Sequence, residues 1–328
     1  MRWDGFVGNE SAKAQLGAAV DSGRLPHALL IEGPRGSGKR TLARLFAKAA
    51  VCTAQGQIPC GVCAQCRKAD TGHPDITELT GDGSAKSLSV ALSRELRAHT
   101  AVVPNEATHK VAILADADCM NVQAQNALLK ILEEPPPYML FVLTVQSRTQ
   151  LLTTVQSRCV CVSLLGVSEQ EALSVLSPRF PSLTTEDLAM RIRLFSGCIG
   201  AVADSVEEDS FAGTVERIRR IGEALTAVNE LELMRATAPL EKDKPLTDAV
   251  LGGLRLVLRD ALALAAGGQV TVSVAPAEAK RLADSFTQRR LHETLAVLDE
   301  LIVSRKRNMN QTLLITLLCA RLRAATGR

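Results

Sequence analysis

A glycine-rich loop at residues 33–39 constrains the fold of this chain more than any other feature. It reads Gly-Pro-Arg-Gly-Ser-Gly-Lys and stands between an apolar run and a helical run. In such loops the glycines let backbone N–H groups turn toward phosphate oxygens, the helix N-terminus adds its dipole, and the lysine neutralises phosphate charge. An ordinary glycine-rich turn is the alternative, but the order of strand, loop and helix favours a nucleotide loop in an α/β fold. The candidate nucleotide-binding residues are Gly33, Gly36, Gly38, Lys39 and Thr41.

The residues that would hold Mg²⁺ at this loop are missing. A hydroxyl residue directly after the lysine ligates the metal in such loops, but this chain has Arg40 there. The apolar run 109–114 should end in two acidic residues, yet Ala115 and Asp116 follow it. A cation at a ligand position repels Mg²⁺ and removes a coordinating atom. We therefore predict that this chain does not hydrolyse ATP, and we interpret Asp116 and Asp118 as strand-end residues that make turn hydrogen bonds.

Short apolar runs alternate with helical patterns in the first half of the chain. Five runs are apolar over most of their length, as strands of a parallel sheet buried on both faces are; they cover 27–32, 75–79, 109–114, 139–144 and 159–162. Helical patterns cover 39–50, 87–99 and 122–132, and three prolines stop the last one. Beyond residue 163 only helical periodicity remains, with amphipathic runs over 215–228, 246–266, 277–303 and 311–325.

These patterns predict three domains. The first, over residues 1–163, is an α/β core with a parallel sheet. The second, over 164–206, is a small helical domain that opens with a capping box formed by Ser168 and Glu171. The third, over 207–328, is all-α.

Four cysteines form a candidate metal site after the first helix of the core. Cys52, Cys60, Cys63 and Cys66 have the spacing C-x7-C-x2-C-x2-C, and closely spaced thiolates converge on tetrahedral Zn²⁺ without a large core around them. Four protein ligands fill the coordination shell, so this zinc would be structural; free thiols on a helix and a loop are the alternative. The other cysteines stand in apolar surroundings and are interpreted as core residues; they are Cys119, Cys159, Cys161, Cys198 and Cys319.

The composition excludes several classes of protein. The 38 basic and 35 acidic residues leave a net charge of +3, which is too small to indicate nucleic-acid or membrane binding by charge alone, so any DNA contact must be local. The apolar content of 46% excludes disorder as the dominant state. The sequence contains no apolar run long enough to cross a membrane and no secretory signal pattern. We therefore expect a soluble cytoplasmic protein without a disulfide scaffold.

Four motifs occur together in an order that is specific. They are Arg24-Leu-Pro-His-Ala28, the four clustered cysteines, the run from Asn126 to Pro136, and Ser157-Arg158-Cys159. In this combination the chain resembles the bacterial DNA polymerase III clamp loader subunits, a branch of the AAA+ ATPases. The resemblance covers most of residues 6–206. It implies an AAA+ nucleotide-binding-type core with a zinc module at 52–66, a helical lid, and a helical collar for oligomerisation.

The same resemblance implies a subunit that does not hydrolyse ATP. The catalytic subunits of the family have an intact metal ligand, an acidic pair and a lid arginine, whereas this chain has Arg40, Ala115 and Gly200. Those departures are similar to the delta-prime type of subunit. By its sequence position alone, Arg158 is a surface arginine that pairs with a carboxylate. The resemblance implies that it is an arginine finger, contributed in trans to ATP bound by a neighbouring catalytic subunit.

Partners follow from the resemblance as well. They are gamma/tau-type ATPase subunits and a delta subunit, with which the chain would help to load the sliding clamp on primed DNA during DNA replication. The family contacts the duplex through its phosphates. Arg94 and Arg97, on the helix expected at 87–99, are candidates for this contact, with a solvated helix face as the alternative. No contact with a membrane is implied.

Two other functions stay open. In the first, the chain is an active ATPase motor subunit of the same loader, of the gamma/tau type, in which Thr41 or Asp116 replaces the lost metal ligands. Hydrolysis that requires Mg²⁺ and is abolished by Lys39→Ala would support it. In the second, the chain is a zinc-containing module that binds nucleic acid, and the ATPase remnants serve only as scaffold. Duplex binding at physiological salt without partners would support that function, but the composition shows no concentrated basic surface.

Overall fold

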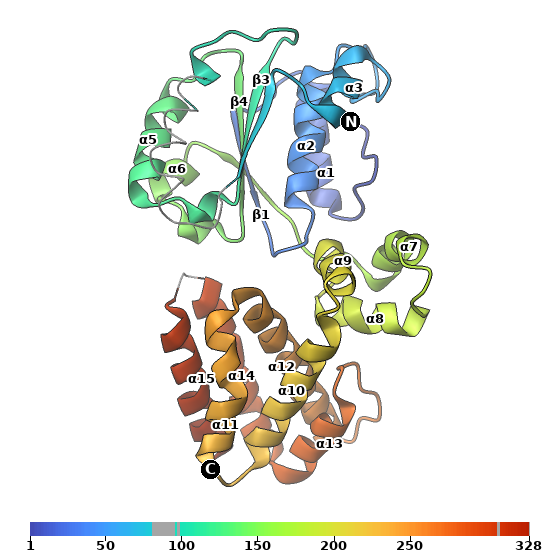
Figure 1. The fold of residues 1–328 in the computed structure, drawn as a ribbon, viewed down its shortest axis with the longest axis vertical. Helices are drawn as coiled ribbons and strands as arrows, with labels where there is room; N and C mark the ends of the chain where they lie inside the picture. The colour runs from blue at the N-terminus through green and yellow to red at the C-terminus, as the bar shows by residue number, and fades with distance from the viewer. Residues whose placement is uncertain (81–95, 97–98, 307–308, 328) are drawn as a thin grey trace. The chain divides into compact units, whose positions relative to one another are not determined.

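The protein folds into two compact units, Met1–Val167 and Ser168–Arg328. The structure, a computed structural model, describes residues 1–80, 96, 99–306 and 309–327. The first unit is an α/β domain built on a five-stranded sheet, and the described part of the second unit is helical (Figure 1). The predicted fold class, an α/β core followed by helical structure, is confirmed.

All five strands of the first unit are parallel and form one sheet in the order β2-β3-β4-β1-β5. The central strands β3, β4 and β1 are buried along nearly their whole length, while β2 and β5 at the edges are more exposed. Each strand begins and ends within one residue of the apolar run that predicted it. The strands are β1 (Ala28–Glu32), β2 (Ile76–Thr80), β3 (Lys110–Ala115), β4 (Met139–Val145) and β5 (Val160–Ser163).

Helices cover both faces of the sheet, as Figure 1 shows. In β1, Leu29 and Ile31 pack in one core cluster with residues of α1 and α2, whereas Leu30 packs in a second cluster with residues of α5 and α6. Full burial of one such side chain contributes about 1.5–3 kcal/mol, so both faces hold the helices in place. The helical elements of this unit are α1 (Glu10–Asp21), α2 (Lys39–Val51), α3 (Ala64–Thr71), η1 (Ala117–Cys119), α5 (Val122–Glu133), η2 (Arg148–Gln150) and α6 (Thr153–Gln156).

In the second unit, α7, α8 and α9 pack on one another, and the longer helices that follow share one apolar core. The capping box at the start of α7 is confirmed: Ser168 Oγ accepts the N–H of Glu171, whose carboxylate accepts the N–H of Ser168. The elements are α7 (Glu169–Arg179), α8 (Thr185–Leu194), α9 (Ile199–Glu207), α10 (Phe211–Thr226), α11 (Glu230–Thr237), η3 (Ala238–Lys242), α12 (Lys244–Ala265), α13 (Pro276–Ser285), α14 (Gln288–Lys306) and α15 (Gln311–Thr326).

The amphipathic run 277–303 is two helices, not one. The chain breaks at Phe286, whose backbone is extended and whose side chain is buried in the core of the unit. Thr287 then accepts the backbone N–H of Arg290 through its hydroxyl at 3.4 Å, as a helix N-cap does. Burial of Phe286 and the new cap together override the periodicity, which continues unbroken across both helices.

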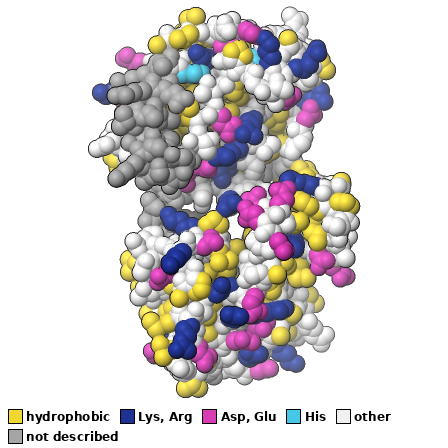
Figure 2. Space-filling model, viewed as in Figure 1, with side chains coloured by type: hydrophobic (Ala, Val, Ile, Leu, Met, Phe, Trp, Pro, Cys, Tyr) yellow, Lys and Arg dark blue, Asp and Glu magenta, His cyan; other side chains and the backbone are white. Residues whose placement is uncertain are grey.

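Two expectations about organisation stay predictions. The boundary that divides 164–206 from 207–328 is one, and the helix expected at 87–99 is the other, because most of its residues lie outside the part that the structure describes. On the face shown in Figure 2, basic and acidic side chains are interspersed over both units. Within the described residues, no helix has the length and apolarity needed to span a bilayer.

Candidate functional site

The glycine-rich loop lies between the end of β1 and the start of α2. It is therefore on the side of the sheet where the parallel strands end, here called the carboxyl edge; the side where they begin is the amino edge. Gly33 lies so close to the segment after β5 that an added Cβ atom would be 2.7 Å from the carbonyl oxygen of Leu164. Gly38 has a φ of 90° and packs against Phe6, whose ring would lie 3.1 Å from an added Cβ. The shape of the loop therefore depends on glycine at both positions.

Lys39, the first residue of α2, is buried beneath the loop. Its Nζ donates hydrogen bonds to the carbonyl oxygens of Gly33 at 2.8 Å and Pro34 at 2.9 Å. The hydroxyl of Ser37 is buried as well and has no hydrogen-bond partner among the described residues. The loop thus retains the lysine and the left-handed glycines of a phosphate-binding loop.

An ion pair stands at the position where the metal ligands are expected. Arg40 Nη2 lies 2.7 Å from Asp116 Oδ2, although the two residues are 76 positions apart in the sequence. Asp116 directly follows β3 at the same carboxyl edge, and its backbone N–H donates to Thr144 Oγ1 on β4 at 3.0 Å. The surviving carboxylate of the expected acidic pair is therefore neutralised by the arginine that replaces the hydroxyl ligand.

Asp116 and Asp118 both follow the end of β3, as interpreted, but only Asp118 makes a turn hydrogen bond with its side chain. Asp118 Oδ2 accepts the backbone N–H of Gln146 at 3.2 Å, as a turn residue does. Asp116 makes no cap bond with its side chain, because Arg40 reaches across the sheet edge and binds it. Burial raises the pKa of Asp118. The hydrogen bond from the N–H of Gln146 lowers this pKa, and the negative charge of Asp116 raises it further, so the net direction is upward. Thr41, the residue after Arg40 in α2, is exposed.

Arg158 lies at the opposite, amino edge of the sheet, two residues before β5. Its Nη2 donates to Glu133 Oε1 at 2.7 Å, and its Nη1 donates to the carbonyl oxygen of Thr154 at 2.9 Å. The side chain of Arg158 is 34% exposed and that of Glu133 is 49% exposed. The expectation that Arg158 pairs with a carboxylate is confirmed, and its role as an arginine finger stays a prediction.

Sequence reasoning missed Glu133 as the partner of Arg158. Helix α5 joins the parallel strands β3 and β4, so it runs back from the carboxyl edge of the sheet to the amino edge. Its last residue, Glu133, therefore lies at the edge where β5 begins, although it is 25 positions from Arg158. The direction of a helix between parallel strands is the signal that could have identified this contact.

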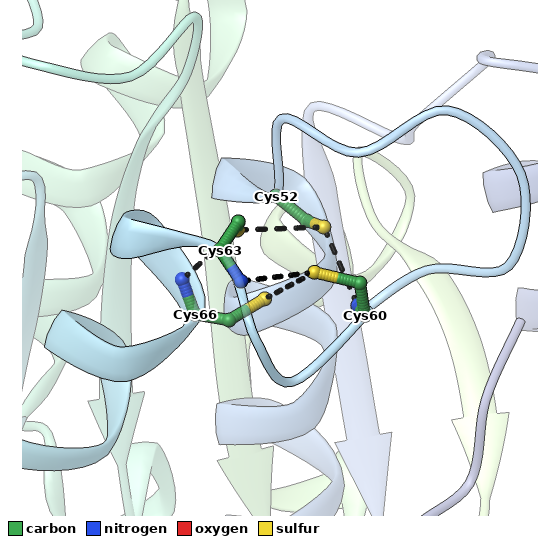
Figure 3. A group of neighbouring side chains, drawn as sticks. All are labelled: Cys52, Cys60, Cys63 and Cys66. Carbon is green, nitrogen blue, oxygen red and sulfur yellow. Dashed lines mark hydrogen bonds between the residues drawn. The ribbon is translucent and has the colours of Figure 1, made fainter.

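The four clustered cysteines converge from the loop after α2 and the start of α3 (Figure 3). All four Sγ atoms lie within 4.8 Å of one another, with 4.0 Å between those of Cys52 and Cys63 and 3.9 Å between those of Cys60 and Cys66. A tetrahedral ion with Zn–S bonds of about 2.3 Å requires S–S separations of about 3.8 Å. The residues therefore fit a tetrahedral metal ion.

Backbone N–H groups support the thiolate form of this cluster. Those of Cys60, Cys63 and Cys66 each donate to the sulfur of the preceding cluster member, at 3.3 to 3.4 Å. Burial opposes ionisation of Cys63, but N–H donors from Thr53 and Cys66 outweigh it and lower the pKa of Cys63 to about 6. Burial raises the pKa of Cys66 to about 12. A positive ion among the sulfurs would favour the thiolate at all four positions.

The remaining cysteines do not all lie in the core. Cys198 is buried, and three others are half-buried: Cys159, Cys161 and Cys319. Burial raises the pKa of Cys159 to about 12. Cys119 is exposed, so its interpretation as a core residue is wrong. Cys119 lies on the short 3-10 helix η1, in which Ala117 is the buried residue.

Several candidate residues are not brought to these sites. Arg94 and Arg97 lie outside the described residues, and their contact with DNA stays a prediction. Gly200 lies in the first turn of α9, and its alignment with a lid arginine stays a prediction too.

Comparison with known proteins identifies relatives of the chain. The family model described as DNA polymerase III, delta subunit matches residues 8–168. The DNA polymerase III subunit delta-prime of Bacillus subtilis is 30% identical over 260 residues, which are 76% of each chain. The gamma/tau subunit of Mycobacterium tuberculosis is 37% identical over 154 residues, 46% of this chain and 26% of that protein, so the chain spans about a quarter of this relative.

Solved structures give a further likeness. A gamma subunit-related DNA polymerase III protein from Thermotoga maritima aligns with 95% of this chain and 99% of its own, at 19% identity and a TM-score of 0.40. The family assignment follows from the Bacillus subtilis match, which covers 76% of each chain, and the family model agrees with it. On these grounds, the chain belongs to the delta and delta-prime family of DNA polymerase III clamp loader subunits, which act in DNA replication.

Proposed function

We propose that the chain is the delta-prime type of clamp loader subunit, which does not hydrolyse ATP and supplies Arg158 to ATP bound by a neighbouring subunit. It assembles with gamma/tau-type ATPase subunits and a delta subunit, and the complex places the sliding clamp on primed DNA. The match to the delta-prime subunit of Bacillus subtilis covers 76% of both chains, whereas the tau subunit of the same organism matches 76% of this chain but 45% of its own length; this difference supports the proposal.

The Arg40–Asp116 ion pair is the observation that carries the proposal. Its N–O distance of 2.7 Å places the guanidinium against Asp116, the acidic residue that directly follows β3. Coordination of Mg²⁺ there requires the carboxylate to leave the arginine, and the arginine then repels the metal. Phosphoryl transfer from ATP depends on that metal to neutralise developing charge on the phosphate oxygens. Hydrolysis by this chain alone is therefore strongly disfavoured.

The position of Arg158 supports a role on another subunit. It lies at the amino edge of the sheet, whereas the chain's own glycine-rich loop lies at the carboxyl edge. A side chain at that edge does not serve the chain's own phosphate loop. An arginine supplied in trans stabilises transition-state charge and raises kcat by about 10³- to 10⁵-fold.

Zinc bound by the four clustered thiolates would be structural, because four sulfur ligands leave no position for water. The cluster lies in the segment that leads from the end of α2 through α3 to β2. Arg2 Nη1 also donates to the carbonyl oxygen of Cys60 at 3.0 Å, which ties the cluster loop to the first residues of the chain. We assign the metal a role in holding this loop.

The test is the ATPase rate of a loader reconstituted with its catalytic subunits, delta subunit, clamp and primed DNA. Arg158→Ala should reduce the stimulated rate by at least about 10³-fold, while Lys39→Ala should change it by less than twofold. Metal-dependent hydrolysis by the isolated chain serves as the control. A rate that falls with Lys39→Ala and not with Arg158→Ala would instead identify an active gamma/tau-type motor subunit.

A further inference from the structure

The run from Asn126 to Pro136 has no assigned role in the sequence analysis, yet it contributes the side chain that holds Arg158. Glu133 ends α5, and Pro135 follows within two residues, so the helix stops at this point. The carboxylate of Glu133 accepts a hydrogen bond from Arg158 Nη2 at 2.7 Å. Two motifs that are separate in the sequence therefore form one contact.

The frame around this contact is rigid. Gln125, buried in α5, donates to the carbonyl oxygens of Met120 at 3.1 Å and Gln150 at 3.4 Å. Its Oε1 accepts the backbone N–H of Leu152 at 2.7 Å. Gln125 thus joins α5 to the segment that leads into α6, and Val155 of α6 is fully buried. Both ends of the Glu133–Arg158 pair are attached to the same frame.

The contact leaves Arg158 able to bind an anion. A guanidinium has five N–H groups, and the bonds to Glu133 and to the carbonyl of Thr154 use two of them. The two acceptors fix the direction of a long side chain that otherwise has about 2 kcal/mol of rotamer entropy. The side chain is 34% exposed, so part of it can be reached from outside the chain.

We propose that Glu133 is a positioning residue that holds the Arg158 guanidinium in place to meet the phosphate of a neighbouring subunit. This inference rests on the proposed function of Arg158 and adds the residue through which its orientation is set. Misplacement of a catalytic group by about 1 Å can cost up to about 100-fold in rate. Loss of Glu133 should therefore slow the chemical step without weakening nucleotide binding by the partner.

The reconstituted loader tests this with four variants of the full chain. Glu133→Ala should lower kcat about tenfold and leave the KM for ATP within twofold, while Glu133→Gln should retain at least half the rate, because its amide oxygen accepts the same bond. Glu134→Ala, the adjacent carboxylate, is the matched control and should not change the rate. Combined Glu133→Ala and Arg158→Ala should be no slower than Arg158→Ala alone, because Glu133 acts through Arg158.

A readout on the isolated chain separates positioning from activity. In ¹⁵N NMR of arginine side chains, the order parameter of Arg158 Nε should fall in Glu133→Ala and recover in Glu133→Gln. Equal or higher kcat in Glu133→Ala would overturn the proposal for Glu133 while leaving the function of Arg158 intact. Unchanged activity in Arg158→Ala would overturn both, and an unchanged order parameter would overturn the positioning role.

Discussion

Two arginine–carboxylate pairs with the same N–O distance of 2.7 Å lie at opposite edges of one sheet. Arg40 and Asp116 meet at the carboxyl edge, where the residues of a metal site are expected. Arg158 and Glu133 meet at the amino edge, beside no phosphate loop of the chain's own. The same type of ion pair thus occupies a metal site at one edge and orients a side chain at the other. Its effect depends on where the fold places it.

The largest effect is expected when the two charges of each pair are exchanged. Combined Arg158→Glu and Glu133→Arg keeps an ion pair but moves the guanidinium to α5, and loader ATPase activity should fall about 10³-fold or more. Combined Arg40→Asp and Asp116→Arg should leave it within twofold. The measurement is stimulated ATP hydrolysis at saturating ATP. A loss at the carboxyl edge as large as that at the amino edge would remove the distinction.

Removing the metal tests whether the structure at the two edges of the sheet depends on the cysteine cluster. Cys66→Ser, or chelation, should release the metal and lower the free energy of unfolding by several kcal/mol, with the full binding free energy of a structural zinc, about 10–16 kcal/mol, as the upper limit. Metal content and thermal unfolding measure this, with exposed Cys119→Ser as the control. The order parameter of Arg158 should stay unchanged under conditions where the protein remains folded. A change there would show that the cluster supports the amino edge as well.

Restoring a hydroxyl residue beside Lys39 should restore Mg²⁺ binding at the carboxyl edge. Arg40→Thr frees Asp116 and supplies an oxygen ligand, so Mg²⁺ should increase nucleotide affinity by about tenfold, or about 1.4 kcal/mol. In the wild-type chain, affinities measured in Mg²⁺ and in EDTA should agree within twofold. Titration with a fluorescent ATP analogue measures both. Arg44→Thr, one turn along α2, is the matched control; a wild-type chain that already requires Mg²⁺ would contradict the role given to Arg40.

The smallest expected effects are on stability. Both pairs are partly exposed, and such pairs contribute about 0–1 kcal/mol. Asp116→Ala and Glu133→Ala should each lower the free energy of unfolding in urea by less than about 1 kcal/mol. Agreement between the two would show that their different effects on ATPase activity come from position. A loss of several kcal/mol in either variant would mean that the pair is structural.

The sequence predicted the strands well because a parallel sheet covered on both faces requires apolar residues along nearly the whole of each central strand. The cysteine spacing predicted a cluster for a similar reason, since ligands to one ion must lie close together. The Arg40–Asp116 and Glu133–Arg158 contacts were not predicted. They join residues 76 and 25 positions apart, and only the strand order and helix direction bring them together.

Local signals also failed where packing decided the outcome. Helical periodicity continues through residues 277–303, but burial of Phe286 and a cap at Thr287 divide the segment. The apolar neighbours of Cys119 suggested burial, whereas a single turn buries one of its residues and exposes another. The burial of Phe286 depends on residues distant in the sequence, which a local pattern does not contain.

A parallel sheet gives a domain polarity, because all strand starts lie at one edge and all strand ends at the other. When the amino edge of one domain contacts the carboxyl edge of the next domain, the contact is heterologous. A row of domains joined in this way has two different ends. A chain with an available arginine at its amino edge, and with its carboxyl edge occupied by its own arginine, can contribute to the site of a neighbour on one side only. Under the proposed function, the Arg40–Asp116 pair removes the need for a second neighbour's arginine, which suits a place at one end of the row.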